Sequence, residues 1–579
     1  MINQLSWKVG GQQGEGIEST GEIFAIALNR QGYYLYGYRH FSSRIKGGHT
    51  NNKIRVSTKA LNSISDDLDI LVAFDQETID VNVNELNSGG VVIADSKFDP
   101  KLPEASNATM YAVPFTEIAN ELGTSLMKNM VAVGASSAIL GLPHEAYREV
   151  VEEIFSRKGS SVVEKNMEAI KRGAEFLQEA AGNQVNSFEL EKADGKKRMF
   201  MIGNHAIALG ALAGGARFMP AYPITPASEI MEYLTKKLPE FGGAVIQTED
   251  EISACTMAIG GNFAGVRTLT ASAGPGLSLM MEAIGLSGIT EIPLVIVNTQ
   301  RGGPSTGLPT KQEQSDLMAM IYGTHGEIPK VVIAPSTVEE AFYDSAEAFN
   351  IAEEYQCPVI ILTDLALSLG KQTVEPLDHS LLEIRRGKFD FNAELPDTNG
   401  EYFKRYELTE DGISPRVVPG MKNGIHHVTG VEHNEQGKPS EDPKNRINQM
   451  NKRLTKLNTL HERFSNPIFT NAPHEEADLL VIGFNSTRGT IEEILPRFDA
   501  DGLKVNHAQV RLVHPFPVDE LKPLMDSAKK VVVVENNATG QLANIIKMNV
   551  SDCKVENVLK YDGNPFLPSE IYTQCKELL

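Results

Sequence analysis

Pro293-Leu294-Val295-Ile296-Val297 is a short apolar run that leads into the polar loop Asn298-Thr299-Gln300-Arg301-Gly302-Gly303. Helical spacing fills most of the intervals between this run and four similar ones, at residues 244–247, 266–270, 331–334 and 359–362. The alternation is typical of a doubly wound parallel sheet. Ligands of such sheets generally bind at the carboxyl ends of the strands, so the loop after residue 297 is a candidate wall of a site.

Working outward, the sequence predicts an α/β chain with three doubly wound or open parallel-sheet domains. Residues 1–180 begin with an apolar run, a glycine loop at 10–16 and a helix, and we expect a mostly parallel sheet there. A polar linker at 181–197 precedes the domain at 198–377, whose first strand is Met199-Phe200-Met201-Ile202 and whose first helix Asn204 can cap. The last domain, 467–579, contains the buried-type strand at 530–535.

Residues 378–466 differ from these domains because they are rich in charge, Gly and Pro. We expect an extended arm that wraps over another domain or chain, since a structureless loop of this length is unusual within a compact domain. A helix at 446–460 closes the arm, and we expect its basic residues to face solvent over an apolar packing stripe. The arm's histidines lack metal-ligand spacing and are expected to be packed or solvent-facing, so no metal site is predicted.

Composition sets further limits on function. The net charge of −21 argues against a general nucleic-acid binder and against docking on an anionic membrane. No apolar run approaches a membrane span and no leader pattern opens the chain, so we expect a cytoplasmic protein. The four cysteines are scattered, without the clustered spacing of an iron–sulfur site.

Three segments carry candidate site residues. Tyr222-Pro223-Ile224-Thr225-Pro226 is a stiff turn that can present the Thr225 hydroxyl, although Thr225 is equally well placed to be a helix N-cap. Thr248-Glu249-Asp250-Glu251 is a carboxylate cluster that can instead serve the dipole of the following helix. Arg301 can hold a substrate carboxylate through two hydrogen bonds, or form an ordinary surface ion pair.

Two glycine loops add weaker signals. The loop Gly11-x-x-Gly14-x-Gly16 has the wrong offsets for a dinucleotide fingerprint and lacks the lysine of a P-loop. It can still hold an anion on helix N-terminal amides, or be a structural turn. Ser272-Ala273-Gly274-Pro275-Gly276 lets a ligand approach the backbone closely, or is a plain strand-to-helix turn.

Taken together, residues 222–226, 249–251, 270–276 and 300–307 resemble the alpha subunit of the 2-oxoacid:ferredoxin oxidoreductases. The loop at 10–14 and Ser43-Arg44-Ile45-Lys46-Gly47-Gly48-His49 resemble that family's gamma domain, fused here ahead of the alpha part. The resemblance covers nearly the whole chain. It implies that the second domain is like a thiamine diphosphate-binding pyrimidine domain and the third like a transketolase C-terminal domain.

The resemblance also implies an activity and residue roles. The family decarboxylates a 2-oxoacid oxidatively on thiamine diphosphate, passes electrons to ferredoxin and transfers the acyl group to coenzyme A. Glu251 would contact the aminopyrimidine ring as the catalytic residue, with Glu249 as the other candidate for that contact. Thr225 and Arg301 would bind substrate, and Tyr222, Pro223, Ile224 and Glu249 would line the cofactor.

The family usually holds the diphosphate and its magnesium with a Gly-Asp-Gly motif, which this sequence lacks. We therefore expect a beta subunit that supplies the magnesium site and a [4Fe-4S] cluster, in a dimer of alpha–beta heterodimers. The fusion most resembles the 2-oxoglutarate enzymes, while pyruvate and branched-chain oxoacids stay open as substrates. Arg39, His40 and Lys46 offer charge for a distal carboxylate. A nucleotide-dependent redox enzyme and a noncatalytic assembly subunit are the competing functions.

Overall fold

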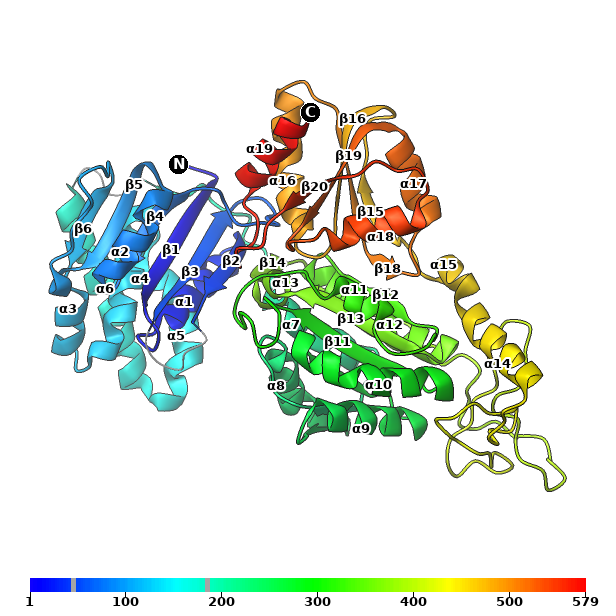
Figure 1. The fold of residues 1–579 in the computed structure, drawn as a ribbon. Coiled ribbons are helices and arrows are strands. Elements are labelled where there is room, and N and C mark those ends of the chain that lie inside the picture. The colour runs from blue at the N-terminus through cyan, green and yellow to red at the C-terminus, as the bar shows by residue number, and fades with distance from the viewer. Residues whose placement is uncertain (43–47, 183–187) are drawn as a thin grey trace. The chain divides into compact units, whose positions relative to one another are not determined.

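The computed structural model describes residues 1–42, 48–182 and 188–579, which form two compact units. One unit contains Met1–Met201, Leu369–Pro376 and Leu567–Ser569, and the other contains Ile202–Ser368, Leu377–Phe566 and Glu570–Leu579. The chain therefore passes between the units several times (Figure 1). No helix among the described residues is long and apolar enough to cross a membrane.

The sheet of the first unit is mixed, which corrects the expectation of a mostly parallel one. Its strands lie in the order β6-β5-β4-β1-β3-β2-β14-β7. Their bounds are β1 Gln4–Gln12, β2 Tyr34–His40, β3 His49–Ser57, β4 Leu68–Ala73, β5 Leu86–Asp95, β6 Thr109–Val113, β7 Met199–Ile202 and β14 Lys371–Val374. β1, β4, β5 and β6 pair in parallel, whereas β3 is antiparallel to both β1 and β2. The connection from β2 to β3 is too short for the crossover that a parallel pair needs, so β3 turns back between β1 and β2.

Helices cover the first sheet (Figure 1), namely α1 Ile17–Arg30, α2 Gln76–Asn82, α3 Phe115–Glu121, α4 Lys128–Leu140, α5 Arg148–Phe155 and α6 Ser160–Ala181. Trp7 of β1 is fully buried, stacks on Phe24 of α1 at 4.2 Å between ring centroids, and donates its indole N–H to Ser136 of α4 at 3.0 Å. Satisfying the buried indole N–H in this way fixes both helices on the sheet.

β7 also corrects an expectation, because it lies in the first unit's sheet beside β14 rather than opening the second. The sequence of a four-residue apolar strand next to a polar linker does not indicate which of two neighbouring sheets the strand will join. The helix after it, α7 Gly203–Ala213, has Ile202 at its N-cap, so Asn204 is not the cap. The buried Asn204 amide instead donates to the carbonyl oxygen of Pro226 at 2.6 Å and so holds the turn at 222–226.

The second unit contains the doubly wound sheet predicted from residues 293–303, with strand order β10-β11-β13-β12-β18. The strands are β10 Leu269–Ser272, β11 Leu294–Gln300, β12 Val331–Ile333, β13 Pro358–Asp364 and β18 Leu512–His514, and only β18 runs antiparallel to its neighbour. The run at 244–247 is not part of this sheet: β9 Ala244–Gln247 pairs with β8 Phe218–Ala221. The helices of this part are α8 Ser228–Lys237, α9 Glu251–Phe263, α10 Gly274–Thr290, α11 Leu317–Tyr322, α12 Val338–Tyr355 and α13 Leu365–Leu369.

A second sheet of the same unit, β15-β17-β16-β19-β20, is built from residues after 467. Its strands are β15 Ile468–Asn471, β16 Ala477–Gly483, β17 Val505–Val510, β19 Ala528–Glu535 and β20 Glu556–Leu559, with helices α16 Thr487–Ala500, α17 Val518–Asp526, α18 Gln541–Asn549 and α19 Pro568–Leu578. Leu277 of α10, Ile296 of β11 and Ile482 of β16 belong to one continuous apolar core. The two sheets are therefore packed together, and we call residues 467–579 the C-terminal domain.

The arm, residues 378–466, packs on the rest of the second unit through buried charges. It has little regular structure before α14 Pro443–Thr455 and α15 Leu460–Arg463. Arg386 and Arg416 of the arm, together with Arg267, bind the buried carboxylate of Glu353 at 2.6 to 2.9 Å. Burial lowers the pKa of Arg416 to about 10, while Glu353 favours the charged form. The ionic contacts give the arm a defined attachment where apolar residues are scarce.

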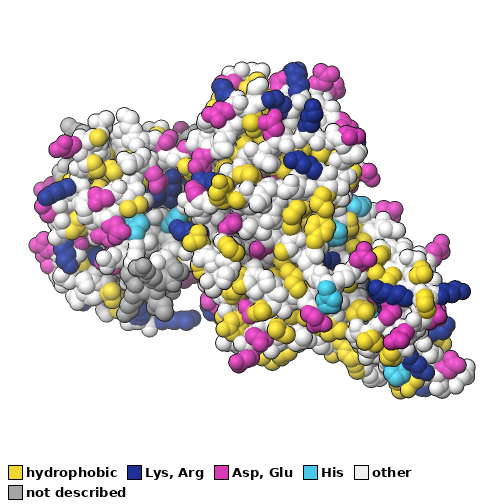
Figure 2. Space-filling view, in the orientation of Figure 1, with side chains coloured by type: hydrophobic (Ala, Val, Ile, Leu, Met, Phe, Trp, Pro, Cys, Tyr) yellow, Lys and Arg dark blue, Asp and Glu magenta, His cyan; other side chains and the backbone are white. Residues whose placement is uncertain are grey.

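The expectation for α14 is wrong in its orientation. Lys452, Arg453 and Lys456 are buried, whereas Ile447 and Leu454 are 59% and 44% exposed. The ammonium groups of Lys452 and Lys456 lie 2.6 and 2.5 Å from the carboxylate of Glu291, which is fully buried. Since the partner carboxylate comes from a distant part of the sequence, spacing within the helix could not reveal it. Figure 2 shows apolar side chains interspersed with charged ones on the visible surface.

Candidate active site

The turn at residues 222–226 follows β8, as the sequence predicts. Tyr222 and Pro223 are exposed, Ile224 and Thr225 are half-buried, and the Thr225–Pro226 peptide is cis. α8 begins at Ser228 with Ala227 as its N-cap and has no side-chain cap, so Thr225 does not cap the helix. The carbonyl oxygen of Thr225 accepts a hydrogen bond from Arg301 Nη1 at 2.5 Å. The turn and the arginine loop are thus in direct contact.

The carboxylate cluster separates into three different environments. Asp250 is the N-cap of α9 and accepts from the Ser253 backbone N–H at 2.7 Å, which lowers its pKa. Glu249 is exposed, whereas Glu251 is 7% exposed. The Glu251 side chain lies over Gly276 at the start of α10, where an added Cβ would come 2.8 Å from Glu251 Oε1 and 2.0 Å from Ser272 Oγ. Only glycine leaves room for this carboxylate.

Beside Glu251, the ends of β10 and β11 carry polar atoms without partners. Ser272 and Asn298 are directly paired across the two strands, and both are fully buried. Ser272 Oγ, Asn298 Oδ1 and the Oγ1 of nearby Thr270 have no hydrogen-bond partner among the described residues. Because orphaned buried polar atoms are costly, they indicate a ligand or ordered water at this sheet edge. The space over Gly276 that holds the Glu251 side chain, together with these polar atoms, fits a polar heteroaromatic group of a cofactor.

Arg301 follows β11 and is 7% exposed. Besides its bond to Thr225, Nη2 donates to the Thr306 carbonyl at 3.5 Å, and the buried Nε lacks a partner. No carboxylate in the described ranges lies within ion-pair distance of the guanidinium. Burial lowers the pKa of Arg301, and the negative charge of Asp316 opposes that shift. The surface ion pair considered from the sequence is therefore not formed, and the guanidinium can still bind an anionic ligand directly.

The structure adds Asp316, which sequence reasoning missed. Its carboxylate accepts from Asn298 Nδ2 at 3.1 Å, and its backbone N–H donates to Gln300 Oε1 at 3.0 Å. An added Cβ on Gly274 would lie 2.9 Å from both Asp316 carboxylate oxygens. Burial raises the pKa of Asp316. Asp316 is the N-cap residue of α11 but makes no side-chain capping bond. An Asp before a helix is ordinarily interpreted as a cap, and this position is distant in sequence from the three motifs.

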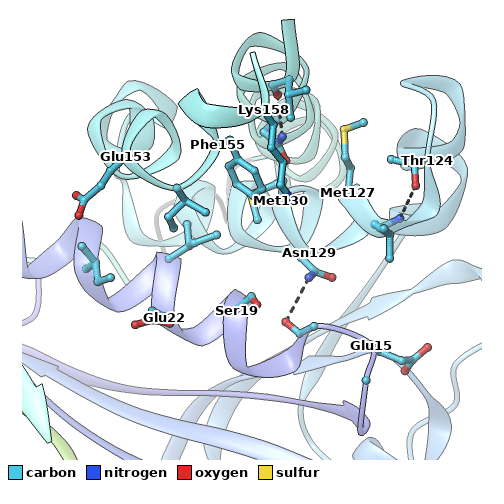
Figure 3. A pocket seen from close by; sticks show the side chains of 18 residues that line it. Glu15, Ser19, Glu22, Thr124, Met127, Asn129, Met130, Glu153, Phe155 and Lys158 are labelled. Atoms are coloured by element: carbon cyan, nitrogen blue, oxygen red, sulfur yellow. Dashed lines mark hydrogen bonds between the residues drawn. The ribbon is translucent and has the colours of Figure 1, made fainter. Parts of the chain in front are cut away.

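The glycine loop at 10–16 lies in the first unit, at the start of α1. Gly16 is the N-cap with φ 84°, and the Gln12 backbone N–H donates to the Glu15 carboxylate at 3.2 Å. A pocket of about 700 Å³ lies beside α1, and Glu15, Glu22 and Glu153 are among its lining residues (Figure 3). The Glu15 carboxylate thus accepts from a loop amide. The three glutamates outnumber the lysine of the lining, Lys158, and this excess of negative charge disfavours a phosphate there. Lys46 and the rest of residues 43–47 lie outside the described ranges.

No group of three or more potential metal-ligating side chains occurs among the residues that the structure describes. The four cysteines are free; Cys255, Cys357 and Cys575 are buried. Burial raises the pKa of each of these three thiols to about 12, which keeps them protonated and unreactive at neutral pH.

Comparison with known families gives three matches along the chain. Residues 209–452 match the thiamine diphosphate-binding domain of pyruvate flavodoxin/ferredoxin oxidoreductases. Residues 6–176 match the pyruvate ferredoxin/flavodoxin oxidoreductase domain, and residues 477–571 match core domain II of pyruvate:ferredoxin oxidoreductase.

Full-length relatives agree with these matches. The chain is 34% identical to a 2-oxoacid:ferredoxin oxidoreductase subunit alpha of a Sulfolobus species, over 98% of this chain and 96% of the relative. It is 31% identical to the 2-oxoglutarate oxidoreductase subunit KorA of Mycobacterium tuberculosis, over 97% and 89%. A solved structure, 2-oxoglutarate:ferredoxin oxidoreductase from Magnetococcus marinus with 2-oxoglutarate, coenzyme A and succinyl-CoA bound, superposes with a TM-score of 0.93 at 35% identity and covers both chains fully.

Proposed function

Because this chain belongs to the 2-oxoacid:ferredoxin oxidoreductases as an alpha subunit, we propose that it forms the pyrimidine and substrate half of a site that converts 2-oxoglutarate to succinyl-CoA. Thiamine diphosphate, when bound, supplies the nucleophilic carbon that attacks the 2-oxo group. Coenzyme A takes the acyl group and ferredoxin takes the electrons. The observation that carries the proposal is the buried Glu251 carboxylate over Gly276, beside the orphaned polar atoms of Ser272 and Asn298.

Glu251 is the residue proposed to contact the cofactor's aminopyrimidine ring. Because Glu251 is buried, its carboxylate can hydrogen-bond a ring nitrogen with little competition from water, which suits a general acid–base role. Glu249, the other candidate, is exposed and therefore less suited. Tyr222, Pro223 and Ile224 would form the adjoining wall of the cofactor site.

Arg301 and Thr225 are proposed to bind the oxoacid. The Arg301 guanidinium is held by two backbone carbonyls and has no carboxylate partner among the residues described, so a substrate carboxylate can complete its charge. Its bond to the Thr225 carbonyl keeps the turn and the cation at a fixed spacing. The Thr225 hydroxyl would then reach the substrate from the same side.

The proposal requires a beta subunit. The sequence has no Gly-Asp-Gly motif and its cysteines are dispersed and mostly buried. We assign the magnesium–diphosphate half-site and a [4Fe-4S] cluster to that partner, in a dimer of alpha–beta heterodimers.

The substrate is assigned from the relatives that are named for 2-oxoglutarate. Lys46 is a candidate for its distal carboxylate. Lys46→Ala should reduce the rate with 2-oxoglutarate more than the rate with pyruvate, and an equal loss on both would remove that role.

The test is co-purification with the beta subunit, followed by oxoacid- and coenzyme A-dependent reduction of a low-potential dye. We expect Glu251→Gln to lower kcat by about 10²-fold or more and Glu249→Gln, the matched control, to retain most of it. Full activity of Glu251→Gln would favour a noncatalytic assembly subunit. No activity of the wild-type complex with any oxoacid would contradict the proposed function.

A further inference from the structure

Asp316 lies at the centre of the candidate site but has no role in the function proposed above. Its carboxylate is hydrogen-bonded by Asn298 at 3.1 Å and pressed against the backbone of Gly274 at the start of α10. Asn298 lies three residues before Arg301, and Gln300, whose side chain holds the Asp316 backbone, directly precedes it. Asp316 is therefore tied to the same strand end that presents the arginine.

The C-terminal domain holds Asp316 in this position. Residues 312–318, which we call the strap, exchange hydrogen bonds with that domain on both sides of Asp316. Gln314 N–H donates to the Asn536 carbonyl at 2.7 Å. Gln541 Nε2 donates to the Ser315 carbonyl at 2.7 Å, and its Oε1 accepts from Met318 N–H at 2.9 Å. Contacts before and after Asp316 keep its carboxylate at the end of β11, where it is bonded by Asn298.

The charges around Asp316 come from few elements. Arg301 after β11 attracts the Asp316 carboxylate, and Glu313 on the strap repels it. Glu251 of α9 lies over Gly276, two residues after the Gly274 that Asp316 contacts. The N-terminus of α10 favours the ionised form. The C-terminal groups that bond the strap, the backbone of Asn536 and the side chains of Asn537 and Gln541, are uncharged. The cation whose charge acts on the Asp316 carboxylate is thus Arg301.

Two anions cannot share one buried cation without cost. When a substrate carboxylate reaches Arg301, the nearby charge of Asp316 repels it, and the arriving charge favours the protonated form of Asp316. Proton binding and substrate binding are then linked: each strengthens the other by the same factor.

We propose that Asp316 is a positioning residue that balances Arg301 in the free enzyme and takes up a solvent proton when the oxoacid carboxylate binds. This inference rests on the proposed role of Arg301. It predicts that oxoacid affinity falls as the pH rises through the range in which Asp316 ionises, by up to about tenfold per pH unit for one coupled proton.

The test uses the complete alpha–beta complex and 2-hydroxyglutarate, which keeps both carboxylates but has no oxo carbon to attack. Calorimetric titration in two buffers of different ionisation enthalpy, between about pH 5 and pH 8, counts the protons taken up on binding. We expect up to about one proton for the wild type and none for Asp316→Asn, in which the amide can still accept from Asn298. Glu313→Gln, which changes the adjacent acid, is the matched control and should keep the uptake.

Turnover gives an independent measurement. The KM for 2-oxoglutarate should rise with pH in the wild type and stay flat in Asp316→Asn, while kcat changes less than KM. If Asp316→Asn does not assemble, Asn298→Ala removes the hydrogen bond that stabilises the carboxylate, and the proton uptake should extend to higher pH.

Wild-type uptake of no proton, an unchanged uptake in Asp316→Asn or Asn298→Ala, or failure of the wild type to bind the analogue would each overturn the inference. Binding without proton uptake leaves the proposed function standing. Normal uptake without oxoacid turnover supports the inference and contradicts the proposed reaction.

Discussion

Replacing Glu291 by Gln should detach the arm from the rest of the second unit. The substitution preserves shape but leaves the buried ammonium groups of Lys452 and Lys456 without their carboxylate, 2.6 and 2.5 Å away. Their other partners are a hydroxyl and carbonyl oxygens: Ser414 and Tyr406 for Lys452, and Gln356 for Lys456. These acceptors cannot compensate two buried charges.

The loss of stability is set by whichever costs less free energy: keeping a lysine charged without its carboxylate, or removing its proton. Leaving one charge unpaired costs about 3–5 kcal/mol in buried pairs. Losing the proton instead costs at most about 4.6 kcal/mol at pH 7 for a lysine with an ordinary pKa of about 10.4. Burial has already lowered the pKa of Lys452 to about 8, so part of the cost of deprotonating this lysine is already included in the stability of the wild type. We therefore expect a loss of about 3–5 kcal/mol in the stability of the arm's attachment.

Hydrogen–deuterium exchange of α14 measures this opening directly, and urea unfolding of the whole chain provides the global comparison. Glu240→Gln, which breaks the exposed pair with Lys237 at 3.3 Å, is the control and should cost no more than about 1 kcal/mol. Replacing Glu291, Lys452 and Lys456 together by Met should recover part of the loss, because both lysine charges are removed with their carboxylate, while the neighbouring buried Arg405 stays bonded to backbone carbonyls. Exchange of α14 in Glu291→Gln at the wild-type rate would refute the reasoning.

Two further outcomes are expected. Gly276→Ala should lower kcat of the complex by about tenfold or more, because the new methyl group would meet Ser272 Oγ and the Glu251 side chain at 2.0 to 2.8 Å. Gly260→Ala is the control, because nothing lies within 4 Å of its added methyl group, and it should fold at least as well as the wild type. Equal activity of the two variants would count against the role of Gly276 in placing Glu251. Burial lowers the pKa of His507 to about 4, so the unfolded chain binds a proton at this histidine before the folded chain does as the pH falls. This difference should remove about 2 kcal/mol of folding stability between pH 7 and pH 5. In urea unfolding, His507→Gln should lose less stability than the wild type over that range, and an identical pH dependence would exclude this contribution.

Much of the second unit was predictable because its information is local. The apolar runs near residues 269, 294, 331 and 359 became parallel strands, and the threonine turn and the arginine loop meet as their positions after strands suggested. Glu251 could be separated from Glu249 only in three dimensions, because its burial depends on the glycine at position 276.

The errors share a different cause. Asn204 binds Pro226 rather than the helix start, and the basic side of α14 faces Glu291 rather than water. Asp316 is positioned by bonds to the C-terminal domain, more than two hundred residues further along. Polar and charged side chains are placed by partners that are remote in sequence, and periodicity within one element cannot reveal those partners.

The position of β14 has a consequence for synthesis of the chain. β14 pairs antiparallel with β2 and lies between β2 and β7, yet it is encoded only after residues 202–368 of the second unit. At ordinary translation rates the ribosome needs on the order of ten seconds to reach it after β7 is made. Throughout that interval β2 is an unprotected sheet edge on the nascent polypeptide, exposed to wrong pairing. Expression of residues 1–201 alone would make this transient state permanent, so an aggregation-resistant version of the first unit should carry residues 369–376 as well.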